Sequence, residues 1–156
     1  MEVKELLELF NIKDYKITPR GVNIYESVQI PDKIRIQKLP FNINICFGTF
    51  SIIRNDLTTL ENCPRKIYGD FHCGWNKLTS LENGPSYIDG NYYCYENLLE
   101  SNFSNTIVTE KFHTSLEEEG LEFINNSYVV DNYRLWQETI KRKRILDKLK
   151  NKNYYV

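Results

Sequence analysis

Residues 55–62 have the sequence NDLTTLEN, and 21 positions later residues 76–83 have the sequence NKLTSLEN. The same shift superimposes five further pairs: Pro64 and Pro85, Ile67 and Ile88, Gly69 and Gly90, Phe71 and Tyr92, Cys73 and Cys94. A fixed period of this size is typical of a solenoid, in which each repeat packs only on its neighbours. Short solenoids usually present recognition surfaces, so the repeat favours binding over catalysis.

Each repeat has the apolar pattern of a short strand followed by a bend. Phe71, Cys73, Asn76 and Leu78 fit L-x-L-x-x-N-x-L, which is the centre of the leucine-rich repeat pattern. We therefore expect parallel strands, stacked in order, at 48–52, 69–73 and 90–94. The predicted fold class is mainly β, a short leucine-rich-repeat-like parallel β-solenoid. We expect Asn55, Asn76 and Asn97 to stack in one ladder and to hydrogen-bond the otherwise unpaired backbone of the turns.

The chain is predicted to be a single domain over 1–156, with a cap at each end of the solenoid. Helical spacing of apolar residues predicts a short helix over 2–11, and alternation over 13–37 predicts a strand pair or an irregular first coil. Helical spacing returns after Asp131, a candidate N-cap, and predicts a basic C-terminal helix. The expected divisions are 1–44 for the N-terminal helix and cap, 45–107 for the solenoid, 108–130 for an acidic loop region, and 131–156 for the C-terminal helix.

Charge is distributed unevenly along the 156 residues. Residues 131–156 carry eight Lys or Arg and three acids, a net of +5, so the total of −1 leaves −6 on the first 130 residues. A basic tail is therefore expected on an acidic body. No stretch is apolar enough to span a membrane and the first residues lack a signal-peptide pattern, which predicts a cytoplasmic protein without membrane contact.

The cysteine pattern predicts buried thiols and no cofactor. Cys73 and Cys94 occupy equivalent repeat positions that should point inward, where a thiol packs as a small apolar group. Zinc sites need paired spacings such as C-x-x-C, which are absent around Cys46, Cys63 and the other two. We expect neither a disulfide nor a metal site.

The outward positions of the predicted strands form a candidate binding surface. Trp, Tyr and Arg dominate interface hot spots, and stacked coils bring equivalent residues about 4.8 Å apart. An alternative is that the N-terminal segment or the loop at 101–127 covers these aromatic rings. The outward residues are Ser51, Ile53, Asn91 and the seven predicted to bind a partner: Arg54, Asp70, His72, Trp75, Tyr93, Tyr95 and Glu96.

Catalysis has little support in the sequence. Alternation directs Cys73 inward and His72 outward, whereas a nucleophile and its base must lie on one face within hydrogen-bond reach. The strongest nucleic-acid feature is the secondary basic patch Lys141, Arg142, Lys143 and Arg144, because basic clusters can bind phosphates. The same run could instead dock on the acidic patch formed by Glu117, Glu118, Glu119 and Glu122.

The segment 57–99, LTTLENCPRKIYGDFHCGWNKLTSLENGPSYIDGNYYCYENLL, resembles the leucine-rich-repeat-like proteins of tailed bacteriophages and prophages. Those proteins repeat a motif similar to N-x-L-T-S-L-E-G-x-P-x-x-V-x-G-x-F-x-C, and their leader resembles residues 8–47 with the pair Leu39-Pro40. This chain departs from the motif at Asn62, where glycine is frequent. The resemblance implies a small cytoplasmic protein that binds something in the infected cell, and it supplies no catalytic residues.

These observations lead to two hypotheses from different classes. The first is a non-enzymatic protein-binding module: a phage effector in the bacterial host cytoplasm that binds and inhibits or redirects a host protein such as a protease, nuclease or defence enzyme. The second is a nucleic-acid-binding protein that acts through the basic C-terminal helix. The sequence leaves self-association open in both cases.

Overall fold

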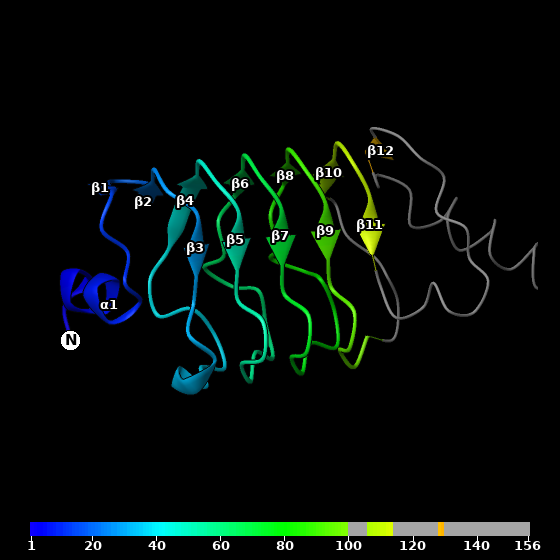
Figure 1. The fold of residues 1–156 in the computed structure, drawn as a ribbon, viewed down its shortest axis with the longest axis horizontal. Coiled ribbons are helices and arrows are strands. Elements are labelled where there is room, and N and C mark those ends of the chain that lie inside the picture. The colour runs from blue at the N-terminus through cyan, green and yellow to red at the C-terminus, as the bar shows by residue number, and fades with distance from the viewer. Residues whose placement is uncertain (100–105, 114–127, 130–156) are drawn as a thin grey trace, which may run out of the picture.

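The computed structural model describes residues 1–99, 106–113 and 128–129. In this part the chain winds into a parallel β-solenoid of stacked coils, with a single α-helix at its N-terminal end (Figure 1). Each coil supplies one short strand to each of two sheets, and successive coils are 20 to 22 residues apart in register. The prediction of a mainly β solenoid is confirmed.

The first sheet contains seven strands in the order β1-β2-β4-β6-β8-β10-β12. Its inner strands are parallel, and antiparallel strands β1 and β12 lie at its two edges. The strands are β1 (Tyr15–Thr18), β2 (Gly21–Ile24), β4 (Ile43–Cys46), β6 (Lys66–Ile67), β8 (Tyr87–Ile88), β10 (Ile107–Val108) and β12 (Tyr128–Val129).

The second sheet contains five parallel strands in the order β11-β9-β7-β5-β3. Phe50, Phe71 and Tyr92 lie in one register, so the predicted order of stacking is confirmed. The sequence prediction covered only this sheet and missed the first sheet as a separate layer. Its strands are β3 (Val28–Gln29), β5 (Phe50–Ser51), β7 (Phe71–His72), β9 (Tyr92–Tyr93) and β11 (Phe112–His113).

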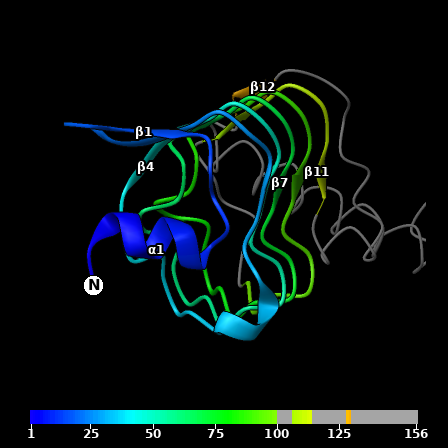
Figure 2. The ribbon, with the colours of Figure 1, turned by 60° about the vertical axis from the view of Figure 1, so that its left-hand side comes forward.

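The N-terminal cap combines a helix with a hairpin. Helix α1 (Val3–Leu9) begins with a capping box in which the Glu2 N–H donates to the Glu5 carboxylate at 3.0 Å, and it buries Leu7. The segment 13–37 contains both predicted alternatives: β1 and β2 form an antiparallel hairpin, and β2 and β3 belong to a first coil that ends in the 3₁₀ helix η1 (Asp32–Ile34). Figure 2 shows β1 projecting beyond the stacked coils.

A column of glycines forms the corner between the two sheets. A Cβ atom on Gly69 would lie 2.6 Å from the carbonyl carbon of Gly48, and one on Gly90 would lie 2.6 Å from the Gly69 oxygen. No side chain fits at these distances, because the backbones of successive coils touch here. Glycine is therefore required before these strands of the second sheet because of the close backbone approach.

The asparagine ladder satisfies the backbone of the turns after the second sheet. The Asn76 Oδ1 accepts from the N–H groups of Asn55 and Leu57, both at 3.1 Å, and its Nδ2 donates to three carbonyls, those of Ile52, Cys73 and Gly74. Asn97 repeats this one coil later, accepting from the Leu78 N–H at 3.1 Å. The predicted ladder is confirmed.

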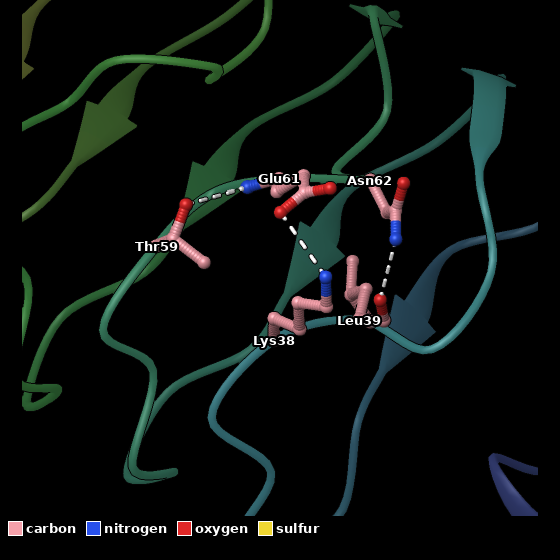
Figure 3. A network of polar contacts seen from close by, with 5 residues as sticks. All are labelled: Lys38, Leu39, Thr59, Glu61 and Asn62. Carbon is pink, nitrogen blue, oxygen red and sulfur yellow. Dashed lines mark hydrogen bonds and ion pairs between the residues drawn. The ribbon is translucent and has the colours of Figure 1, made fainter.

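The returning segments are also joined from coil to coil by side chains (Figure 3). The Asn62 Nδ2 donates to the Leu39 carbonyl at 2.8 Å, and the Lys38 ammonium lies 3.2 Å from the Glu61 carboxylate. Asn62 has a φ of 70°, in the left-handed region. Asparagine tolerates that region better than most residues, which explains the departure from glycine at this position.

The interior between the sheets is apolar. Phe50, Phe71 and Tyr92 are fully buried and pack ring against ring along the solenoid. All four cysteines are buried thiols, and the inward orientation predicted for Cys73 and Cys94 is confirmed. Within the described residues, no helix has the length and apolar character needed to cross a membrane. The predicted C-terminal helix over 131–156 lies outside the described residues.

Candidate binding face

The outer side of the second sheet carries a stack of three rings. His72, Tyr93 and His113 occupy one register on β7, β9 and β11. The ring centroids of His72 and Tyr93 are 4.4 Å apart with an interplanar angle of 12°, and those of Tyr93 and His113 are 4.5 Å apart at 7°. Both faces of the Tyr93 ring are therefore covered by imidazoles. All three side chains are partly exposed at their edges.

Next to this stack, the turn after each strand projects a large side chain. Arg54, Trp75 and Glu96 are equivalent residues of successive coils, and their φ angles are 52°, 51° and 54°. Trp75 is 42% exposed, with the Arg54 guanidinium carbon 5.3 Å from its ring centroid. Tyr95 meets Trp75 edge to face at 4.7 Å and lies 6.2 Å from Tyr93. We refer to Arg54, His72, Trp75, Tyr93 and Tyr95 as the binding face.

The backbone at Trp75 adopts a conformation that bulky side chains avoid. The left-handed region costs an L-residue roughly 1–2 kcal/mol, and glycine or asparagine would occupy it more easily. The chain does place asparagine at the left-handed turn on the returning side of the coil, at Asn62 and Asn83. Strained positions of this kind concentrate at functional sites, so the turn at Trp75 supports a role for its side chain outside the fold.

Asp70 acts mainly within the solenoid. Its Oδ1 accepts from the backbone N–H of Asn91 at 2.7 Å and from the Asn91 side-chain amide at 3.1 Å. This carboxylate is half-buried and joins two coils. Of the other outward residues predicted, Ser51 and Ile53 are half-buried and Glu96 is exposed.

The surroundings of His72 and Tyr93 in the ring stack disfavour their charged forms. Partial burial lowers the pKa of His72 below its ordinary value; the nearby Asp70 carboxylate opposes this shift and His113 adds to it. The pKa of the Tyr93 hydroxyl is raised by burial, with smaller contributions from Asp70 and Tyr95. Both shifts favour the uncharged forms of the His72 and Tyr93 side chains.

The structure brings together most of the predicted site. Arg54, His72, Trp75, Tyr93 and Tyr95 form one continuous set of ring contacts, and the exposure of Trp75 shows that the N-terminal segment does not cover it. The secondary basic patch lies outside the described residues, and so does the acidic patch that could dock with it: Lys141, Arg142, Lys143, Arg144, Glu117, Glu118, Glu119 and Glu122.

A second group of exposed rings was not predicted from the sequence. Tyr25, Phe47 and Tyr68 lie on the outer side of the first sheet, close to the glycine corner, and are 44%, 47% and 41% exposed. Their spacings of 22 and 21 residues follow the period of the repeat. That spacing is the signal that could have revealed them. However, Tyr25 and Phe47 precede residue 55, where the recognisable repeat motif begins.

The arrangement around Cys73 does not form a catalytic pair. Its thiol is fully buried on the inner side of the second sheet, and His72 lies on the outer side. Burial also raises the pKa of Cys73 well above its ordinary value, which disfavours the nucleophilic thiolate. Across the described part of the chain, no three His, Cys, Asp or Glu side chains are grouped as a metal site.

Comparison with known proteins gives no match: no protein-family model, no curated protein and no solved structure is significantly similar to this chain.

Proposed function

We propose that this protein is a non-enzymatic binding module that recognises another protein through the binding face. The observation that carries the proposal is Trp75, which is large, exposed and held in a strained turn. Tryptophan, tyrosine and arginine provide most of the affinity in typical interfaces, and here Arg54 and Tyr95 support the Trp75 ring from two sides.

The rigidity of the binding face favours tight recognition. Aromatic rings bury a large area with few rotatable bonds, so little conformational entropy is lost when a partner binds. Mutual contacts restrict these rings further before binding, which lowers the entropic cost of association. The resemblance of residues 57–99 to repeat proteins of bacteriophages supports a bacterial host protein as the partner, which the phage protein would inhibit or redirect.

The test starts with affinity purification from a bacterial lysate on the immobilised full chain. A protein retained by the wild type should lose at least about 2 kcal/mol of binding free energy, roughly 30-fold in Kd, when Trp75 is replaced by alanine. Trp75→Gly should weaken binding equally, although glycine fits the left-handed turn without strain. Isothermal titration with the purified partner measures the loss, and a thermal melt of each variant tests folding.

The alternative proposal, nucleic-acid binding through residues 141–144, predicts the opposite pattern. Neutralising Lys141, Arg142, Lys143 and Arg144 should then abolish binding, and affinity should fall steeply with salt. The protein-binding proposal predicts weak salt dependence and little effect of these changes. Unaltered binding by both Trp75 variants would contradict the proposed role of the binding face.

A further inference from the structure

A row of aromatic rings runs along the outer side of the first sheet. Tyr25 and Phe47 have ring centroids 5.2 Å apart and an interplanar angle of 5°, and Phe47 and Tyr68 are 5.4 Å apart at 9°. Tyr87 continues the contacts at 5.8 Å from Tyr68, with its ring tilted by 53°. We call Tyr25, Phe47, Tyr68 and Tyr87 the aromatic row. It belongs to a different sheet from the binding face and does not depend on the function proposed for that face.

Stacking determines which part of each ring a ligand can reach. The facing sides of Tyr25, Phe47 and Tyr68 cover one another, yet each of these residues is at least 41% exposed. The exposed parts are therefore the ring edges, which form a corrugated apolar ridge. A nucleobase stacks on the open face of an aromatic ring, and Phe47 has both faces occupied. The aromatic row thus fits a ligand with an apolar, ribbed surface.

The spacing of the ridge matches the pitch of an α-helix. Along the ridge the ring centroids of Tyr25, Phe47 and Tyr68 follow one another at 5.2 and 5.4 Å, and an α-helix advances about 5.4 Å per turn. A strand repeats a side-chain direction about every 6.6–6.8 Å, and a polyproline helix advances about 9.3 Å per turn. A helix lying along these three rings would thus place one side chain near each ring over about two turns, and its next turn would lie beside Tyr87, whose ring contacts Tyr68 from the neighbouring register.

The neighbouring row of side chains adds a charge preference. On the same face, Asn23, Ile45 and Lys66 lie two positions before Tyr25, Phe47 and Tyr68, and Lys16 and Tyr87 extend their register at its two ends. Both lysines are exposed, and Ile45 is partly exposed. Asp89 takes the place of an aromatic residue one coil after Tyr68, which limits the length of the apolar ridge. A helix with carboxylates along one flank complements the two lysines.

We propose that the aromatic row docks an amphipathic α-helix of about three turns. Its apolar side chains follow the spacing i, i+4, i+7 and i+11, which places them on one face of a helix. Its acidic side chains lie on the flank that faces Lys16 and Lys66. Large exposed apolar patches commonly mark such interaction sites, and this one has the length and period of a short helix.

The test uses two labelled peptides with the same composition and the full-length protein. The first is a 14-residue helical peptide with leucines at its first, fifth, eighth and twelfth positions and glutamates along one flank. The second contains the same residues with leucines in strand alternation. Fluorescence anisotropy should show binding of the helical peptide only. Phe47→Ser should weaken that binding at least 10-fold, and Lys66→Glu should weaken it and reduce its salt dependence.

Two controls keep the test decisive. Trp75→Ala alters the binding face alone and should leave peptide affinity unchanged, which separates this proposal from the proposed function. Tyr68→Ser provides a second variant in case Phe47→Ser fails to fold, as judged by thermal melting. The proposal is overturned by equal affinity for the two peptides, by no binding of either, or by unchanged affinity of both serine variants. Sedimentation of the wild type as a dimer that Phe47→Ser dissociates would also overturn it, because a second copy would then occupy the row.

Discussion

The coils have two kinds of left-handed turn, and different kinds of residue occupy them. Asn62 and Asn83 occupy left-handed turns on the returning side of the coil, where asparagine is well suited to the backbone. Arg54, Trp75 and Glu96 occupy left-handed turns beside the second sheet, where asparagine would fit equally well. The turn on the returning side thus carries the residue that suits its backbone. The turn beside the second sheet carries large side chains in spite of its backbone conformation.

Two leucines separated by 20 positions provide a direct test of the core. Leu78 is fully buried, and Leu98 is 63% exposed. Leu78→Ala should lower the free energy of unfolding by about 2–5 kcal/mol, because it removes buried methyl groups and leaves a cavity. Leu98→Ala should change it by less than about 0.5 kcal/mol. Urea unfolding of both variants checks the difference, and equal effects would contradict the assigned orientation of the repeat.

At the scale of elements, most strands contain only two residues. Such strands are held by their neighbours, since the backbone bonds between coils run through equivalent positions. The N–H groups of Phe50 and Phe71 donate to the carbonyls of Asp70 and Asn91 at 2.9 and 2.8 Å. Side-chain stacks add to these bonds, and the stack of His72, Tyr93 and His113 joins three strands of the second sheet.

This ring stack should make stability depend on pH. The pKa of His72 is lower in the folded protein than its ordinary value of about 6.5, mainly because of partial burial. The unfolded chain therefore binds a proton first as the pH falls. This contribution to stability is fully present above about pH 6.5 and is lost as the pH falls toward the lower pKa of the folded state. Unfolding free energies measured between pH 7 and 5 should decrease, and His72→Gln should make the decrease shallower.

A second variant distinguishes this cause from other titrating groups. The Asp70 carboxylate raises the pKa of His72 and so opposes the effect of burial. Asp70→Asn should lower the pKa of His72 further, which NMR titration of the imidazole can measure directly. An unchanged His72 titration in this variant would show that Asp70 does not influence the stack.

For the whole molecule, the close packing of coils depends on the glycine corner. Gly69→Ala would place a Cβ 2.6 Å from the backbone of both Gly48 and Thr49, and the backbone of that neighbouring coil cannot move away without separating the two coils. We expect a loss of at least about 1–3 kcal/mol in unfolding free energy, the range seen for overpacked cores. Thermal and urea unfolding of the variant measure this loss.

Gly84→Ala is the matched control for this prediction. The nearest atom to a Cβ at Gly84 is Cδ1 of Leu60 at 3.0 Å, which can shift with its side chain. This variant should be clearly less destabilising than Gly69→Ala. If the two changes were equally tolerated, the coils would not be in contact at the glycine corner.

Much of the fold could be predicted from the repeat, because each coil meets the same surroundings as the next. The inward side of Cys73 and Cys94 and the ladder through Asn76 follow from this equivalence. The first sheet could not be predicted in the same way. Its strands β6 and β8 contain two residues each and show too little alternation to mark a separate layer.

The sequence alone determined the period, the inward residues and the corner glycines, since all of these repeat every 21 residues. Only the tertiary structure decided how the rings meet. The cation–π contact of Arg54 with Trp75, the covering of Tyr93 by two imidazoles and the spacing of Tyr25, Phe47 and Tyr68 arise when coils stack. The physical reason is that a period fixes which residues are neighbours, whereas exposure and ring orientation depend on how closely the coils pack.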